Sequence, residues 1–176
     1  MSPQLLQRVA VLLLLAISAL PAALGQAGMR AALILPGQRT AAPEFQLQDS
    51  SGKAADIKSY RGKIVLLDFW ATWCHGCKEE IPWFAEFERK YRDSGLRVVG
   101  VSLDDGGWKV VKPFISSASV PYRIVLGNEA VSSQYKIAQM PDTFIIDRQG
   151  RVAAKYVGMV DKGNMDANIR AVLAEH

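Results

Sequence analysis

Residues 66–77 read LLDFWATWCHGC, an apolar run followed by a short loop that carries two cysteines. The run from Ile64 to Phe69 has the length and the side chains of a buried strand, and the residues after the loop favour a helix. Both cysteines are therefore expected where the loop becomes the helix. This strand, loop and helix are the segment around which we expect the chain to fold.

The two cysteines, Cys74 and Cys77, are the only ones among 176 residues, so any intramolecular disulfide must join them. A loop this short has little chain entropy to constrain, so a stabilising role explains the pair poorly. At a helix N-terminus, free N–H groups and the helix dipole favour a thiolate at the first cysteine. That thiolate can attack a disulfide, and the second cysteine can resolve the mixed disulfide. We therefore predict a redox pair, with Cys74 as nucleophile and Cys77 as resolving thiol.

Half of a zinc site is the alternative interpretation of this pair. Zinc takes about four ligands, and besides the thiols the chain offers only His75 and the terminal His176. His75 lies between the cysteines and would be strained as a third ligand. No metal site is predicted.

The string DFWATWCxxCK strongly resembles the thioredoxin superfamily, in which such a pair follows a strand and opens a helix. APxF at residues 42–45, GK before the central strand and CKEEIP at residues 77–82 resemble its TlpA/ResA-like branch. That resemblance implies an exported or membrane-tethered thiol–disulfide oxidoreductase that needs no cofactor. It also implies an α/β thioredoxin fold, with a mixed central sheet flanked by helices, an N-terminal hairpin and a central α/β insertion.

The hydrophobic pattern predicts the remaining elements. We expect a hairpin that turns at Ser51-Gly52, a helix from Cys74 to about Arg92, strands over Arg97–Leu103 and Arg123–Leu126, a helix around Trp108–Ile115, a short helix over Val131–Lys136, a hairpin of Thr143–Asp147 and Val152–Val157, and a closing helix around Met165–Leu173.

The N-terminus has the layout of a secretory signal, because Arg8 precedes an apolar run and small residues follow it to Ala27. Residues 1–27 are predicted to be a signal peptide or an uncleaved membrane anchor, residues 28–41 a linker, and residues 42–176 the thioredoxin-like domain. Export would place the pair in the periplasm or another compartment where disulfides persist, either free or anchored to the outer face of the inner membrane. The net charge of +4 comes from scattered side chains, so nucleic-acid binding is not expected.

Two acids are candidates for proton carriers beside the thiols. Asp68 interrupts an apolar strand and matches the superfamily's buried acid below the second cysteine. Glu80 shares a helix face with Phe84 and Phe87 and matches the acid that follows the cysteines in the TlpA/ResA branch. Burial would raise the pKa of either carboxyl. The alternatives are a solvated strand end for Asp68 and a surface position for Glu80.

The stretch MPDT at residues 140–143 resembles the superfamily's cis-proline loop, which faces the cysteines and pairs with the substrate chain. The resemblance assigns substrate contacts to Met140 and Pro141. Trp73 is expected to shield the site, or else simply to pack. An ordinary trans proline at the start of a strand is the alternative for Pro141.

The dipeptide between the cysteines departs from the commoner family pattern. Gly76 stands where many relatives carry proline, which would fix the first helical turn. A protonated His75 would stabilise a neighbouring thiolate, whereas a solvent-facing His75 would have little influence. Both positions are expected to tune the reduction potential.

We predict a disulfide reductase of the cytochrome c maturation type, which acts on protein disulfides, takes electrons from a membrane thiol donor and works as a monomer. A thiol oxidase or isomerase would use the same residues and differ in potential. A peroxiredoxin is disfavoured because its PxxxTxxC motif would need proline at Leu67 and threonine at Ala71. A copper-binding module is the non-enzyme alternative, but its relatives space the cysteines one residue further apart.

Overall fold

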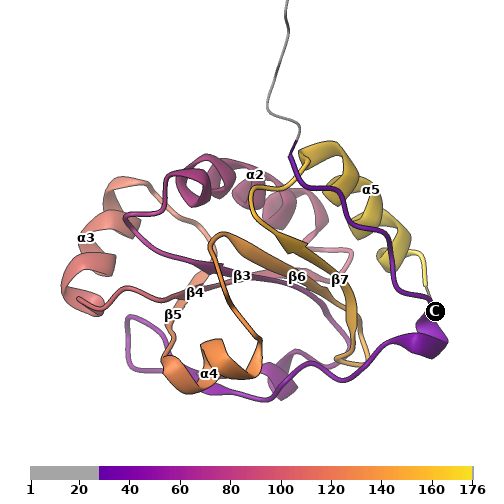
Figure 1. Ribbon diagram of the computed structural model, residues 1–176, viewed down its shortest axis with the longest axis horizontal. Coiled ribbons are helices and arrows are strands. Elements are labelled where there is room, and N and C mark those ends of the chain that lie inside the picture. Colours follow the sequence, from indigo (N-terminus) through magenta and orange to yellow (C-terminus); the bar gives the residue numbers. More distant parts are fainter. Residues whose placement is uncertain (1–27, 176) are drawn as a thin grey trace, which may run out of the picture.

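The computed structural model describes residues 28–175, and a five-stranded sheet in the order β5-β4-β3-β6-β7 forms its centre (Figure 1). The strands are β3 (Ile64–Trp70), β4 (Leu96–Ser102), β5 (Arg123–Leu126), β6 (Asp142–Ile146) and β7 (Val152–Val157). Strands β3, β4 and β5 run parallel, whereas β6 and β7 pair in antiparallel fashion beside β3. The sheet is therefore mixed, as predicted.

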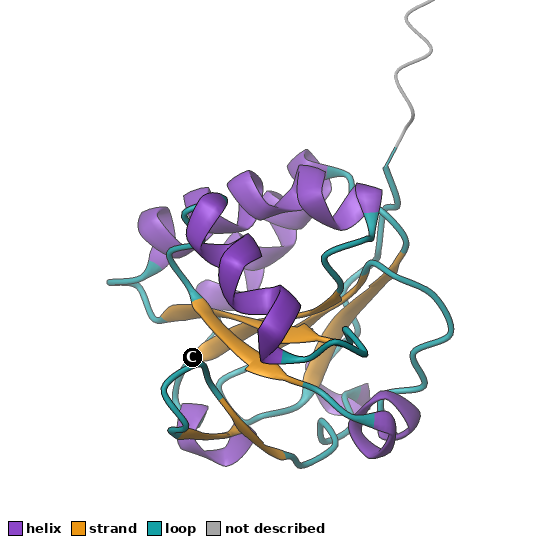
Figure 2. Ribbon diagram, turned by 90° about the vertical axis from the view of Figure 1, so that its left-hand side faces the viewer, coloured by secondary structure: helices purple, strands orange, loops and turns teal. Residues whose placement is uncertain are grey.

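Helices and a hairpin cover the two faces of this sheet (Figures 1 and 2). Helices α2 (His75–Tyr91), α3 (Trp108–Ser117) and α5 (Lys162–Leu173) lie on one face. The hairpin of β1 (Gln46–Gln48) and β2 (Ala54–Asp56) and the short helix α4 (Glu129–Gln134) lie on the other. Because both faces are covered, all seven residues of β3 are buried, which explains its nearly unbroken apolar sequence.

Helix α2 packs against the sheet with the face that the sequence predicts to be buried. Its buried side chains include Glu80, Phe84, Phe87 and Tyr91, which recur at the helical period. Glu80 is thereby carried into the core beside three aromatic residues. The expected helix over Val131–Lys136 begins earlier, at Glu129, because the side chain of Asn128 accepts a hydrogen bond from Val131 N at 2.9 Å and caps it.

The segment 28–41, expected to be a linker, is instead packed against the domain, and we call it the N-terminal strap. Ile34 N donates to Ala153 O at 2.8 Å, and Val152 N donates to Thr40 O at 2.9 Å. These bonds cover the outer edge of β7, which would otherwise expose unpaired backbone groups. The strap has no regular apolar period, so its backbone pairing is not visible in the sequence.

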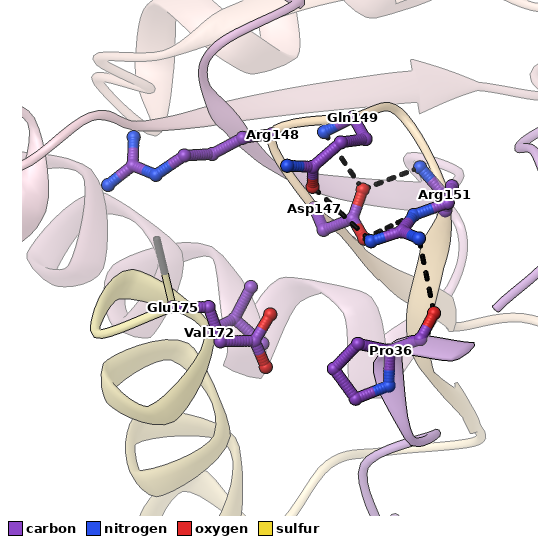
Figure 3. A pocket seen from close by; sticks show the side chains of 7 residues that line it. All are labelled: Pro36, Asp147, Arg148, Gln149, Arg151, Val172 and Glu175. Carbon is purple, nitrogen blue, oxygen red and sulfur yellow. Dashed lines mark hydrogen bonds and ion pairs between the residues drawn. The ribbon is translucent and has the colours of Figure 1, made fainter. Parts of the chain in front are cut away.

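A buried guanidinium fixes the end of the strap. Arg39 Nη1 lies 3.2 Å from Asp147 Oδ2, and its two terminal nitrogens bind the carboxylate of Glu175 at 2.6 and 2.7 Å. Asp147 also accepts from Arg151 Nε at 2.9 Å, and Arg151 Nη1 donates to Pro36 O at 3.1 Å (Figure 3). This cluster joins the strap, the β6–β7 turn and the end of α5, at the opposite end of β6 from Pro141.

The predicted leader, residues 1–27, lies outside the described residues. Within residues 28–175, none of the helices combines the length and the apolar character needed to cross a bilayer.

Candidate active site

The two cysteines form a disulfide where α2 begins, at the position that the sequence pattern predicts. Cys74 is the N-cap residue of the helix, and its Sγ accepts a hydrogen bond from Cys77 N at 3.2 Å. Cys74 is 6% exposed and Cys77 only 1%. The N–H group that caps the helix would also stabilise a thiolate on Cys74 in the reduced protein. The geometry therefore favours Cys74 over Cys77 as the attacking thiol.

Asp68 lies in the sheet beneath this helix, on the same face of β3 as Leu66 and Trp70. It is 1% exposed, and Thr143 Oγ1 donates to its Oδ1 at 3.2 Å. Burial is the main cause that raises the pKa of Asp68, the Thr143 bond opposes it and the charge of Asp142 adds to it, and the net pKa is about 7. The alternative of a solvated strand end is excluded.

Glu80 lies one helical turn beyond Cys77 and is fully buried. Its Oε1 accepts a hydrogen bond from Val160 N at 2.6 Å, whereas its Oε2 has no partner among the described residues. Burial and, to a smaller extent, the charge of Asp68 raise the pKa of Glu80 against the opposing effect of the Val160 bond, and the net pKa is about 9. Glu80 is therefore a protonated acid at neutral pH, and the surface alternative is excluded.

The cis-proline loop faces the start of α2, as the resemblance implies. The Met140–Pro141 peptide bond is cis. A Cβ built on Gly76 would lie 3.5 Å from Pro141 Cδ, an ordinary contact distance, so glycine is not required there by lack of space. Met140 is partly buried against the apolar cluster that contains both cysteines. The structure thus brings the loop and the disulfide together.

Two predicted tuning or binding residues project into solvent. Trp73, the neighbour of Cys74, is 67% exposed, so it is not packed into the core of the domain. The side chain of His75 is 90% exposed, and its Nε2 lies 3.1 Å from Glu79 Oε1.

Asp104, which the sequence analysis did not single out, holds the loop that leads to the cysteines. Its carboxylate accepts from Thr72 N at 3.0 Å and from the hydroxyl groups of Thr72 and Ser102. Asp104 follows β4, and β4 runs parallel to β3, so the two loops emerge at the same edge of the sheet. The sequence places Asp104 directly after a predicted strand, but the pairing of that strand with β3 is needed to bring Asp104 to the site.

Tyr122 and Asp142 are two further buried groups near the site. Burial and the nearby charges of Asp68 and Glu80 raise the pKa of Tyr122. Asp142 follows the cis-proline and lies on the opposite face of the sheet, with its Oδ2 at 3.0 Å from Lys155 Nζ. Burial raises the pKa of Asp142 to about 6, more than the Lys155 contacts lower it.

No group of three or more His, Cys, Asp or Glu side chains with the geometry to hold a metal occurs between residues 28 and 175. A strand-fixed acid, a helix-fixed acid and a dithiol at a helix N-terminus can exchange disulfides and move the accompanying protons.

Comparison with known proteins identifies the class of protein to which this chain belongs. Residues 39–155 match the AhpC/TSA family, and the chain belongs to that family. The chain is 31% identical over 130 residues to the thioredoxin-like protein YneN of Bacillus subtilis, covering 73% of this chain and 76% of the relative. It is 34% identical over 119 residues to the thiol-disulfide oxidoreductase ResA of the same organism, covering 66% of this chain and 65% of the relative.

Solved structures agree with these relatives. A crystal structure assigned as the thiol:disulfide interchange protein DsbE from Chlorobium tepidum superposes with a TM-score of 0.74 at 30% identity, covering 77% of this chain and 97% of that one. The thioredoxin fold is therefore confirmed. The protein is a thiol–disulfide oxidoreductase of the ResA/DsbE type, with Cys74 and Cys77 as its dithiol.

Proposed function

We propose that this oxidoreductase works as a reductase, which uses the Cys74–Cys77 dithiol to reduce disulfides in exported proteins. The burial of Cys77 in the layer that contains Asp68 and Glu80 carries the proposal. A strongly oxidising dithiol owes its potential to a stabilised thiolate. Here burial and the negative charge of an ionised acid both disfavour a thiolate on Cys77. These effects on Cys77 favour the disulfide state and oppose the stabilisation that the helix N-terminus gives a thiolate on Cys74. We propose that the effects on Cys77 prevail, which makes the dithiol a good electron donor.

The reaction balances with these residues alone. The thiolate of Cys74 attacks one sulfur of the substrate disulfide, forms a mixed disulfide and releases the first substrate thiolate, which takes up a proton. Cys77 then loses its proton, attacks Cys74 Sγ and releases the second substrate thiolate. Neutral Glu80, whose pKa is raised to about 9, supplies the proton for the first substrate thiolate and, once ionised, accepts the proton that Cys77 loses. Asp68, whose pKa is raised to about 7, can hold or release a proton at neutral pH. The second substrate thiolate carries the negative charge that Cys74 had at the start. The products are a reduced substrate and the Cys74–Cys77 disulfide.

Exposed groups around the disulfide suit a polypeptide substrate. Trp73 offers an apolar face beside Cys74, and the backbone next to Pro141 can pair with an extended chain. We propose proteins that await cytochrome c maturation as the substrate class. Regeneration then requires a second dithiol, which we assign to a membrane protein that delivers electrons to the periplasmic side.

The proposed setting follows from the leader predicted over residues 1–27. We propose that the domain acts in the periplasm, either after cleavage or tethered to the outer face of the inner membrane. We further propose that it acts as a monomer, with one dithiol per catalytic unit.

The equilibrium reduction potential tests the direction of electron flow. The Cys74–Cys77 couple, equilibrated with glutathione or dithiothreitol buffers, is expected at or below about −270 mV, the value of thioredoxin. A potential near about −120 mV, the value of a strong oxidant, would show that the protein is an oxidase. The Cys77→Ala variant, expressed with its leader, should accumulate mixed disulfides on Cys74, and mass spectrometry of the trapped partners would name the substrates.

A further inference from the structure

The beginning of the N-terminal strap pairs with residues 159–161, next to the active site. Met29 N donates to Met159 O at 2.6 Å, and Asp161 N donates to Met29 O at 2.8 Å. These two bonds form a parallel bridge between Met29 and Val160. In such a bridge, the N–H of the central residue points away from its partner strand. The N–H of Val160 therefore faces the interior of the domain.

The interior partner of that N–H is Glu80, whose Oε1 accepts it at 2.6 Å. The same short segment also contacts the rest of the site. Gly158 N donates to Pro141 O at 2.8 Å, and Met159 Cβ would lie 3.8 Å from a Cβ built on Gly76. Residues 158–160 thus connect the buried acid, the cis-proline loop and the start of α2.

Contact between the strap and this segment requires glycine at residue 28. A Cβ built on Gly28 would lie 2.2 Å from Val160 O and 2.5 Å from Asp161 N. Both are backbone atoms, so a side chain at this position would force the strap and the segment apart. At Gly37, in the same strap, no atom lies within 4 Å of a built Cβ.

We propose that Gly28 and Met29 are positioning residues of the active site, which hold Val160 against Glu80 and so set the reactivity of the dithiol. When the strap moves away, Val160 loses its support and its N–H withdraws from Glu80. Glu80 then holds its proton more tightly, because this hydrogen bond stabilises its ionised form. Glu80 begins to ionise as pH approaches about 9, and in that range a neutral Glu80 repels a neighbouring thiolate less than a charged one does. A thiol that titrates in the same range therefore ionises at lower pH.

Other titratable groups lie around Glu80 and Val160 and must stay unchanged in a test. Asp68 faces it from β3, Glu79 precedes it on α2, and Tyr122 approaches from the loop before β5. Asp161, next to Val160, pairs with Arg30 at 3.4 Å on the strap side. None of these residues is altered by a substitution at residue 28.

The experiment compares Gly28→Ala with Gly37→Ala in the full-length reduced protein. Alkylation of Cys74 by iodoacetamide is followed against pH by mass spectrometry, and the fold is checked by near-UV circular dichroism. For Gly28→Ala we expect the midpoint of the Cys74 alkylation curve to move to lower pH by about half a unit or more. This shift corresponds to about a threefold change in the ionisation constant of the thiol. Gly37→Ala should reproduce the wild-type profile.

A double substitution separates positioning from general loosening. The Glu80→Gln variant has no ionisable group at residue 80. Adding Gly28→Ala to it should therefore leave the pH dependence of Cys74 alkylation unchanged. Should Gly28→Ala fail to fold, Met29→Pro, which removes the N–H that binds Met159 O, serves as the second variant. The proposal would be overturned if a folded strap variant showed the wild-type pH dependence of Cys74 alkylation. It would also be overturned if Gly28→Ala still shifted that dependence in the Glu80→Gln background. Because each variant is compared with the wild type, the result holds for either direction of electron flow.

Discussion

Replacing Glu80 by glutamine should stabilise the protein at neutral and alkaline pH. The side chain is fully buried, and one of its oxygens lacks a partner among the described residues. Glutamine has nearly the same shape, and its Oε1 can accept the Val160 N–H. The substitution therefore removes an ionisable group and preserves the packing.

The size of the effect follows from the raised pKa of Glu80. The group loses its proton near its ordinary value of 4.5 in the unfolded chain and near about 9 in the folded protein. Between these values the folded state binds more protons, so the free energy of unfolding falls as pH rises. Each pH unit costs about 1.4 kcal/mol, so from pH 4.5 to pH 7 the loss approaches about 3 kcal/mol. Glu80→Gln escapes this loss, and its advantage should disappear below pH 4.5.

Urea unfolding of the disulfide form at pH 4, 5.5, 7 and 8.5 measures the difference, and Glu79→Gln is the matched control. The side chain of Glu79 is 47% exposed, so its removal should change stability little at any pH. A Glu80→Gln advantage that is the same at all four pH values would refute the assignment of Glu80 as a buried neutral acid. So would a destabilised variant at pH 8.5.

Three further predictions concern the thiols, the loop before them and the strap. Cys74 should be alkylated faster and at lower pH than Cys77 in the reduced protein, as measured by peptide mapping; a faster Cys77 would reverse the role assignment. Asp104→Asn should lower turnover in an insulin-reduction assay and destabilise the fold by about 1–2 kcal/mol in urea unfolding, because it weakens charge-assisted bonds to the loop. The control variant Asp105→Asn should change neither turnover nor stability. Arg39→Ala should cost about 2–4 kcal/mol in urea unfolding, because it leaves a buried carboxylate short of a partner, yet the alkylation profile of Cys74 should stay unchanged. A shifted profile would show that the far end of the strap also acts on the site.

The sequence predicts the site where its residues lie close together along the chain. Cys74, Cys77 and Glu80 share one helix start, so their spacing alone places them within a turn or two of each other. Asp68 is only six residues before Cys74 and belongs to the strand that leads there. Pro141 is distant in sequence, and only its resemblance to a known loop brought it to the site. Asp104 and Val160 carry no such resemblance and were missed.

The amino-acid pattern by itself determined the order of strands and helices, the redox pair and the burial of two acids, because each depends on local periodicity and on neighbours within a few residues. Tertiary structure alone decided the rest. Asp104 binds Thr72 only because β3 and β4 lie side by side and in parallel. The strap reaches Val160 through backbone groups, which every residue carries and which therefore leave no mark in the sequence. The pKa of Glu80 depends on that same contact and on the exclusion of water, which only a complete packed core provides.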